Sequence, residues 1–281
     1  MALIGAHVSA SGGVHRAVER ASALGCEAMQ FFTHNPLQWN GRAPSSLETE
    51  SFRRALLASG VRKVTVHASY LINLAGDDHV RNTSVGAVKN EIELCCSLGV
   101  DSLVLHPGSS KGSPRRYALD RLVSALEHIL SATEDKNVSI LLETMAGQGD
   151  VLGSSFDELE YVLDALGWDR RLGVCADMCH MFGAGFDVRS EGGYLRTVLN
   201  LKKRFGLDRV GCWHLSDSKG TAGSGTDRHE HIGEGEIGVI PFGMLVSDER
   251  FADTPAILET PKEGIGDEGN LALLRKLRGS L

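Results

Sequence analysis

The sequence predicts an α/β protein, a (β/α)8 TIM barrel that forms a single domain over residues 1–281. Two observations predict this fold class. Short apolar runs that are typical of strands recur along the chain, and segments with helical periodicity lie between them. Dividing 281 residues over eight repeats gives about 35 residues each, which matches one strand–helix unit of this barrel.

The expected strands are mostly apolar without alternation, which is typical of strands buried on both faces of a parallel sheet. They span residues 3–8, 28–32, 61–66, 102–105, 138–142, 172–176, 210–213 and 256–258. Between them, apolar residues spaced by about 3.6 positions predict helices. One helix is expected to start after Ser113-Pro114 and another after Ser154-Ser155, and glycines at 25, 60, 99 and 206 end others.

A doubly wound open sheet is the alternative architecture. The loop after the first strand reads S-A-S-G-G, which lacks the G-x-G-x-x-G pattern that such sheets often use to bind phosphates. The longest segment without periodicity, residues 215–238, is rich in Gly, Asp, His and Glu. A loop of this length in a compact domain usually serves a function.

Composition places the chain among ordinary globular proteins. Hydrophobic residues make up 42% and charged residues 23%, and the net charge is −7, so the average field does not attract nucleic acid. No apolar run is long enough to span a membrane, and the first residues do not resemble a signal peptide. We therefore expect a cytoplasmic protein whose six cysteines are reduced and serve mainly in packing.

Six consecutive predicted strands each end in a histidine or a carboxylate. These residues are His67, His106, Glu143, Asp177, His214 and Glu259. In a barrel they would surround the C-terminal mouth, where active sites of this fold lie. Carboxylates and imidazoles crowded together without a counter-charge are costly, and a bound cation removes that cost. The pattern therefore predicts a metal site.

Two further motifs extend this set. His180 follows Asp177 by three residues, and Asp227 and His229 form an Asp-x-His pair in the long loop. Spacing alone leaves open whether His229 or His231 is the ligand. The resulting nine donors are enough for up to three metal ions, if each ion takes about three protein ligands.

The donor types favour zinc, with manganese as an alternative at one position, over calcium or magnesium. A thiolate from Cys175 or Cys179 is a less favoured alternative. Three divalent ions would outweigh the four carboxylates and give the mouth a local positive charge that suits an anionic substrate. Paired metal ions also suit hydrolysis of a phosphodiester.

Several segments of the chain closely resemble the endonuclease IV (deoxyribonuclease IV) family of bacterial-type apurinic/apyrimidinic endonucleases. The resemblance covers essentially the whole chain and rests on G-A-H-V-S-A-S-G-G (5–13), F-T-H-N-P-L-Q-W (32–39), H-A-S-Y-L-I-N-L-A (67–75), L-H-P-G-S (105–109), E-T-M-A-G-Q-G (143–149), C-A-D-M-C-H-M-F-G-A-G-F-D (175–187), H-L-S-D-S-K (214–219), D-R-H-E-H-I-G-E-G-E-I-G (227–238) and L-E-T-P (258–261).

The resemblance implies a TIM barrel with three zinc ions that cleaves damaged double-stranded DNA on the 5′ side of an abasic site. The products would be a 3′-hydroxyl and a 5′-deoxyribose phosphate, and blocked 3′ ends would also be cleaned. The implied ligands are His67, His106 and Glu143 for the first ion, Glu143, Asp177, His214 and Glu259 for the second, and His180, Asp227 and His229 for the third. His231 is then spare, because the family's ligand histidine directly follows D-R.

The resemblance also implies residues that bind DNA. Tyr70 and Leu71 match wedge residues that enter the minor groove at the lesion. Asn35, Gln38 and Trp39 match a second DNA-contacting loop. Two positions depart from the family pattern, because Leu37 replaces a common arginine and His34 replaces a common lysine. Loss of these cations predicts a weaker dependence of DNA binding on salt.

The expected mechanism is attack by a hydroxide held between the first two ions and oriented by the catalytic residues Glu143 and Glu259, while the third ion stabilises the leaving oxygen. A metal-dependent sugar isomerase or epimerase on a related barrel is the alternative, and a non-catalytic metal-binding or DNA-docking protein is a third class. The nine-donor set with its Asp-x-His pair speaks against the epimerase. We expect a monomer, for want of an obvious partner surface.

Overall fold

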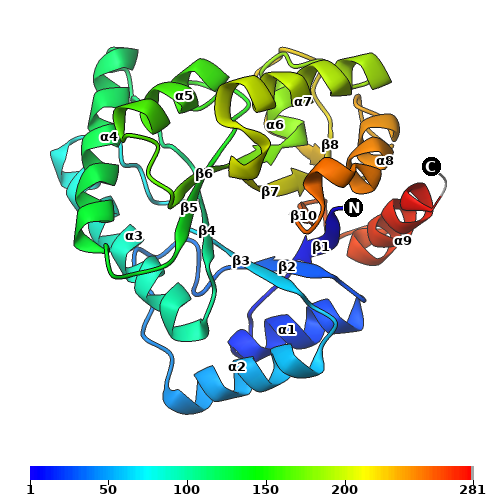
Figure 1. The fold of residues 1–281 in the computed structure, drawn as a ribbon, viewed down its shortest axis with the longest axis horizontal. Coiled ribbons are helices and arrows are strands. Elements are labelled where there is room, and N and C mark those ends of the chain that lie inside the picture. The colour runs from blue at the N-terminus through cyan, green and yellow to red at the C-terminus, as the bar shows by residue number, and fades with distance from the viewer. Residues whose placement is uncertain (280–281) are drawn as a thin grey trace.

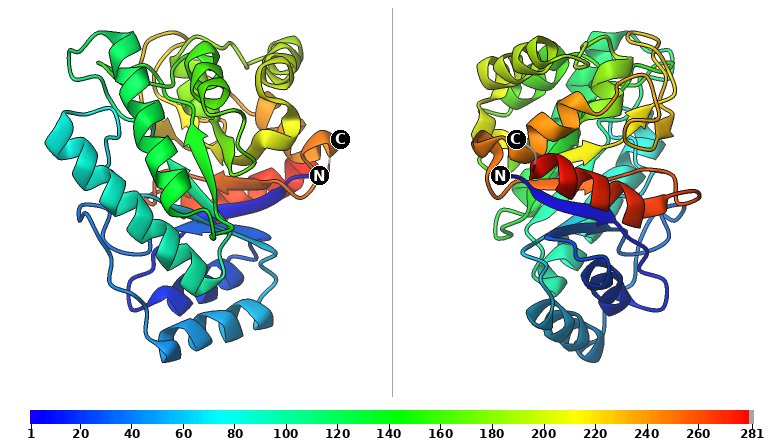
Figure 2. Two further views of the ribbon diagram at one scale, coloured as in Figure 1. Left: turned by 60° about the vertical axis from the view of Figure 1, so that its left-hand side comes forward. Right: turned by 90° about the vertical axis from the view of Figure 1, so that its right-hand side faces the viewer.

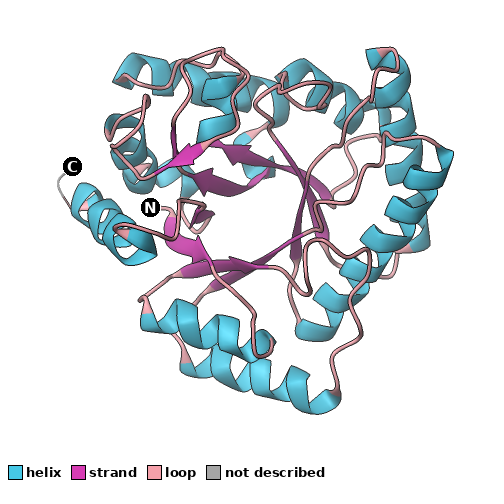
Figure 3. Cartoon of the chain, turned by 180° about the vertical axis from the view of Figure 1, so that it is seen from behind, coloured by secondary structure: helices cyan, strands magenta, loops and turns pink. Residues whose placement is uncertain are grey.

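Eight parallel strands close into a barrel in the computed structural model, which describes residues 1–279. Around the barrel the described strands follow the order β1-β10-β7-β6-β5-β4-β3-β2, and helices form an outer ring (Figures 1 and 3). The barrel strands are β1 (Leu3–His7), β2 (Ala28–Phe31), β3 (Lys63–His67), β4 (Ser102–Leu105), β5 (Ser139–Glu143), β6 (Leu172–Asp177), β7 (Val210–Leu215) and β10 (Pro255–Leu258). The predicted fold class is confirmed.

The helices connect successive strands. They are α1 (Val14–Ala23), α2 (Ser46–Ala58), α3 (Asp78–Leu98), α4 (Arg115–Ala132), α5 (Phe156–Ala165), α6 (Met178–Gly183), α7 (Glu191–Phe205), α8 (Ile240–Ser247) and α9 (Gly266–Arg278), with short 3-10 turns at Leu207–Arg209 and Glu249–Phe251. The last helix, α9, packs beside the first strand, β1, so the two ends of the chain meet where the ring closes (Figure 2).

The predicted helix boundaries rest on capping chemistry. Ser155 precedes α5 and its hydroxyl accepts a hydrogen bond from the backbone N–H of Asp157. Gly99 follows α3 with a φ of 76°, a left-handed conformation that glycine adopts without a Cβ clash. The strand boundaries differ slightly from the prediction. β3 begins at Lys63 and includes His67, because His67 still pairs with Val104 of β4.

The segment 215–238 is more ordered than a loop. It contains a small antiparallel pair made of β8 (Asp217–Ser218) and β9 (His229–Glu230). The buried Asp217 carboxylate accepts hydrogen bonds from the backbone N–H groups of Gly233, Ile237 and Gly238 at 2.8–3.1 Å. This carboxylate therefore fixes the path of the chain that follows β9.

The barrel interior is layered. One layer is apolar and consists of Leu3, Ala28, Val104, Leu141, Cys175, Cys212 and Ile257. Side chains alternate along a strand, so the residue two positions later points the same way. That rule places His106, Glu143, Asp177, His214 and Glu259 directly beyond five members of the apolar layer. The strands thus seal the barrel beneath these residues and hold them at the mouth. In the part of the chain that is described, no helix has the length and apolar character needed to cross a bilayer.

Candidate metal centre

The nine predicted ligand side chains lie at the C-terminal mouth of the barrel in three neighbouring groups; six stand at ends of barrel strands, His180 is on α6, and Asp227 and His229 come from the segment after β8. Within each group the donor atoms lie within 4.8 Å of one another. The groups are His67, His106 and Glu143; Glu143, Asp177, His214 and Glu259; and His180, Asp227 and His229. Residues spread over most of the chain therefore converge, and Glu143 belongs to two groups.

Glu143 lies at the centre of this arrangement, at the end of β5. Its Oε2 lies 3.3 Å from Nε2 of His67 and 3.2 Å from Nε2 of His106. Its Oε1 lies 3.1 Å from Nδ1 of His214 and 3.1 Å from Nδ1 of His180. One carboxylate thus faces the first group with one oxygen and members of the second and third groups with the other.

Asp177 is positioned by its place between β6 and α6. Its Oδ1 accepts a hydrogen bond of 2.6 Å from the backbone N–H of His180, which caps the first turn of α6. Its Oδ2 lies 3.8 Å from Nδ1 of His214. The cap fixes one oxygen and leaves the other facing the second group.

Asp227 joins the third group from the loop before β9. Its Oδ1 lies 3.2 Å from Nε2 of His180 and 3.4 Å from Nε2 of His229. Its Oδ2 accepts a hydrogen bond of 3.0 Å from the amide of Gln148. His231, the other histidine of this loop, instead has its Nδ1 2.9 Å from the amide nitrogen of Asn270.

Backbone carbonyls orient three of these histidines. The Nδ1–H of each donates a hydrogen bond to a main-chain oxygen, so Nε2 is the free nitrogen that points into the centre. The three bonds join His67 to Ala68, His180 to Thr144 and His229 to Glu259, at 2.8, 2.9 and 2.7 Å.

The donor set fits bound cations. Oδ2 of Asp177 and Nε2 of His180 are buried and have no hydrogen-bond partner among the described residues. Buried polar atoms are normally satisfied, and atoms left over at a site are candidates for an ion. The donors are imidazole nitrogens and carboxylate oxygens, which bind zinc well.

In this centre, burial and nearby opposite charges shift the pKa values of the ionisable groups in opposite directions. Burial alone would raise the pKa of the Glu143 carboxyl, but the imidazoles of His214 and His106 hold that pKa well below its ordinary value. Burial would lower the pKa of His180 and His214, but neighbouring carboxylates raise both pKa values well above the ordinary range. Protons on these histidines and divalent cations are therefore alternative sources of the positive charge that the carboxylates require.

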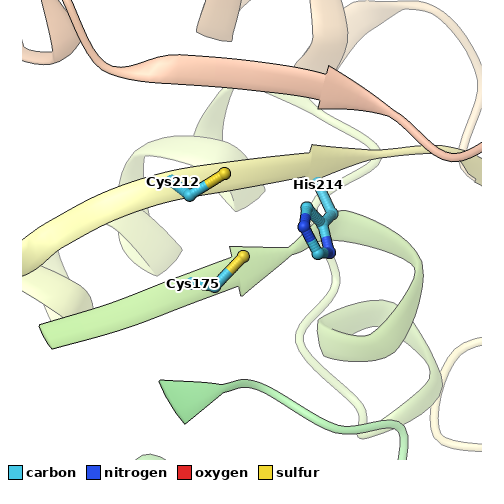
Figure 4. A group of neighbouring side chains, drawn as sticks. All are labelled: Cys175, Cys212 and His214. Atoms are coloured by element: carbon cyan, nitrogen blue, oxygen red, sulfur yellow. The ribbon is translucent and has the colours of Figure 1, made fainter. Parts of the chain in front are cut away.

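A pair of thiols lies below the second group. Figure 4 shows Cys175 on β6 and Cys212 on β7, with His214 farther along β7. Donor atoms of these three residues also lie within 4.8 Å of one another. Burial raises the pKa of the Cys175 thiol well above its ordinary value and that of Cys179 to about 12, which disfavours both as thiolate ligands. Burial would also raise the pKa of Cys212, but hydrogen bonds to Cys175 and His214 lower it to about 6.

The sequence-based prediction missed two residues, His7 and Gln30. His7 ends β1 and its Nδ1 lies 3.2 Å from Oε1 of Glu259. The strand-end rule that found the other residues applies to His7 as well. Gln30 is a fully buried amide inside β2 that contacts both Glu259 and His214. A polar residue inside an otherwise apolar strand was the available signal.

Comparisons with known proteins agree with this arrangement. Residues 18–278 match the family model described as a xylose isomerase-like TIM barrel. The chain is 44% identical over 280 residues to the probable endonuclease 4 of Chloroflexus aurantiacus, covering 99% of this chain and 98% of that protein. The chain belongs to the endonuclease IV family.

Solved structures place the fold in the same family. The crystal structure of endonuclease IV from Thermus thermophilus superposes with a TM-score of 0.87 at 35% identity and covers 99% of this chain and 100% of that one. A D-tagatose 3-epimerase-like protein superposes with a TM-score of 0.73 at 21% identity, covering 99% and 96%, and shares the fold alone. The comparisons therefore favour the endonuclease IV family over the epimerase alternative.

The predicted DNA-contacting residues of this endonuclease IV family member lie on two loops. Leu37 is 69% exposed, and Asn35 and Gln38 are also exposed, on the loop between β2 and α2. Tyr70 is 53% exposed and Leu71 half-buried on the loop after β3. The structure therefore leaves all five side chains at least partly accessible at the mouth.

A buried carboxylate from α3 supports the first loop, which in turn is bonded to the second loop. Oε2 of Glu91 accepts a hydrogen bond of 2.7 Å from the Thr33 hydroxyl, and its Oε1 lies 3.4 Å from Nδ1 of His34. The carbonyl of Pro36 accepts hydrogen bonds from the hydroxyl of Ser69 at 2.8 Å and from the backbone N–H of Tyr70 at 3.1 Å. These contacts tie the first loop to the second.

A cleft of about 890 Å³ opens beside the first donor group. Tyr70 and His106 line its inner end, and Lys111, Tyr117 and Arg121 line other parts of its wall. The ring of Tyr70 lies 5.5 Å from that of His67 and 5.8 Å from that of His106. The metal centre in this endonuclease IV family member is therefore open to a large ligand on the side of Tyr70.

Proposed function

We propose that the chain hydrolyses the phosphodiester on the 5′ side of abasic sites in duplex DNA, leaving a 3′-hydroxyl and a 5′-deoxyribose phosphate, and that it also removes blocks from 3′ ends. The observation that carries this proposal is the sharing of Glu143 between two donor groups at the barrel mouth, with a third group beside them. Membership of the endonuclease IV family supports it.

The proposed cofactor is a set of three zinc ions, with manganese as the alternative at one position. His67, His106 and Glu143 would hold the first ion, Glu143, Asp177, His214 and Glu259 the second, and His180, Asp227 and His229 the third. When bound, these ions would supply the positive charge that stabilises a phosphoryl transition state and would activate water. All nine donors come from one chain, which supports a monomer as the active unit.

Glu143 and Glu259 are the proposed catalytic carboxylates. Oε1 of Glu259 accepts a hydrogen bond of 2.7 Å from Gln30, while Oε2 lies on the side of His214, at 3.5 Å from its Nδ1. The second oxygen can therefore accept a hydrogen bond from an attacking water and orient it toward the phosphorus. Glu143 fixes the relative positions of the imidazoles around it through both of its oxygens.

Asn35, Leu37, Gln38, Tyr70 and Leu71 are the proposed DNA-binding residues. An abasic nucleotide has no base to unstack or unpair, so it leaves the duplex at lower cost than an intact nucleotide. Tyr70 stands at the edge of the first donor group, where its ring can fill the space left in the base stack. The adjoining cleft can then accept the displaced sugar–phosphate.

A nicking assay combined with metal analysis tests the proposal. The purified protein is incubated with supercoiled plasmid that carries abasic sites and with intact plasmid, and its zinc and manganese contents are measured. We expect stoichiometric metal and incision of the abasic plasmid only. Absence of bound metal, or equal action on both plasmids, would contradict the proposal. Epimerisation of a ketose without nicking would support the alternative class.

A further inference from the structure

We propose that Gln30 is a positioning residue that fixes the orientation of both His214 and Glu259 toward the second metal ion. This inference rests on the proposed function, because it concerns how that metal centre is held. Gln30 belongs to β2, whereas His214 belongs to β7 and Glu259 follows β10. The side chain therefore reaches past β1 to residues that it does not adjoin in the sheet.

The amide of Gln30 is completely buried and both of its polar atoms are engaged. Its Nε2 donates a hydrogen bond of 2.7 Å to Oε1 of Glu259 and lies 3.0 Å from Nδ1 of His7. Its Oε1 lies 3.0 Å from Nε2 of His214. One amide thus contacts two proposed ligands with its two ends.

Electrostatics fixes which way this amide points. A carboxylate can only accept hydrogen bonds, so the amide nitrogen must face Glu259. Turning the amide around would place its oxygen against the carboxylate oxygen and would lose the bond. The amide oxygen therefore faces His214, where it requires a hydrogen on Nε2. The contact with Glu259 thereby determines the tautomer of His214.

The tautomer decides which nitrogen of His214 can bind a metal ion. With the proton on Nε2, the lone pair on Nδ1 points toward Glu143 at 3.1 Å and Glu259 at 3.5 Å. His67, His180 and His229 present the other nitrogen, Nε2, and are oriented by backbone carbonyls. His214 is oriented by a side chain, so a substitution at Gln30 can remove its support.

The same amide also gives the two oxygens of Glu259 different partners. Oε1 is held by Gln30 and lies near His7, which leaves Oε2 on the side of His214. Loss of the amide would free the carboxylate to rotate and would leave a buried imidazole N–H without an acceptor. Partners that orient metal ligands in this way typically contribute about 10- to 100-fold in metal affinity.

The test compares Gln30→Met with Thr65→Val. Methionine matches glutamine in length and removes both hydrogen bonds. Thr65 is the register partner of Gln30 on β3, is equally buried, and its hydroxyl has no hydrogen-bond partner within the described chain. Zinc affinity is measured by competition with a chromophoric chelator. We expect Gln30→Met to weaken one of the three zinc sites about 10- to 100-fold and Thr65→Val to leave all three unchanged.

Two more measurements keep the inference testable if Gln30→Met does not fold. In the zinc-loaded natural protein, nitrogen-15 NMR of the histidine rings should show His214 protonated at Nε2, and protonation at Nδ1 would overturn the inference. The Gln30→Glu variant keeps an oxygen that accepts a hydrogen bond from His214, but its carboxylate repels the carboxylate of Glu259. We expect it to preserve this tautomer while weakening the same zinc site, and an unchanged zinc affinity would contradict the role toward Glu259.

Failure of this inference differs from failure of the proposed function. Incision kinetics of Gln30→Met should show a lower kcat with little change in KM for abasic duplex. If the natural protein binds zinc but does not nick abasic DNA, the proposed function fails, and the NMR and zinc affinities still test Gln30. If Gln30→Met binds zinc as tightly as Thr65→Val, the positioning role is wrong, whatever the substrate.

Discussion

Nδ1 of His214 lies 3.1 Å from Oε1 of Glu143, although β6 separates their strands β7 and β5 in the barrel. This contact passes over the end of β6 and is possible because both side chains point inward just above the apolar layer of the barrel. Through this contact, Oε1 of Glu143 meets His214, which belongs to the second donor group. A substitution at the end of β7 can therefore affect the position of the Glu143 carboxylate on β5.

Glu259→Gln should keep the fold and lose most of the turnover. The amide has nearly the same size as the carboxylate but lacks its charge, so we expect kcat for abasic-site incision to fall about 100-fold or more. Single-turnover incision and thermal unfolding measure the two effects. The control is Glu263→Gln, an exposed residue on the following segment. Incision by Glu259→Gln at nearly the natural rate would remove Glu259 from the mechanism.

Tyr70→Ala should weaken binding to abasic duplex more than binding to intact duplex. The lost ring no longer fills the gap in the base stack, and aromatic stacking on nucleic acid is worth roughly tenfold in affinity. Fluorescence anisotropy with the two duplexes measures the difference. Leu199→Ala, an exposed apolar residue on α7, is the control. Equal losses on both duplexes would assign Tyr70 to packing of its loop.

Leu37→Arg should strengthen DNA binding at low salt. The exposed side chain stands on the first DNA-contacting loop, and one new phosphate contact should steepen the slope of log affinity against log salt by about 0.9. Binding titrations over a range of salt concentrations provide the slope. Leu57→Arg, on the exposed face of α2, adds the same charge elsewhere. If both variants change the slope equally, the effect reflects net charge rather than a contact at Leu37.

Zinc binding should release protons. Burial would lower the pKa of His180, His214 and His229, but neighbouring carboxylates raise the pKa of the first two well above its ordinary value. Against the same effect of burial, a hydrogen bond to Asp227 is the main cause that raises the pKa of His229 to about 9. These three histidines are therefore protonated at pH 7 in the metal-free protein, whereas a ligand imidazole must be neutral, so apparent zinc affinity should rise with pH.

Calorimetry in buffers with different ionisation enthalpies counts the released protons. The substitution His128→Gln, at an exposed histidine on α4, should not change the count. Zinc binding without proton release would show that the carboxylates do not hold these histidines in the charged form.

The sequence was sufficient to predict the barrel and six of the nine donors by simple periodic rules. The strands are apolar runs, and these six donors stand where the runs end, as His67 and Glu143 do. The other three came from local motifs, and the choice of His229 over His231 came from the family resemblance. Gln30 was harder to predict, because its role depends on contacts with β7 and β10, which no local pattern encodes. The pair of β8 and β9 was also missed, because two-residue strands leave no periodic pattern in the sequence.

The endonuclease IV family and the fold class were also predicted correctly. The roles of Leu37 and Tyr70 stay predictions, because exposure on a loop shows where a side chain can meet DNA but not whether it does. The support that Glu91 gives to the first loop could not be seen in the sequence, since a lone glutamate within a helix is usually solvated.

The carbonyl of Glu259 that orients His229 belongs to the segment that follows the last barrel strand. Two of the three donor groups thus depend on Glu259, near the end of the chain. The second group needs its carboxylate, and the third group needs its main-chain oxygen to orient His229. During synthesis, a chain that has not yet delivered β10 lacks a complete centre. The proposed cleavage of DNA therefore requires a closed ring.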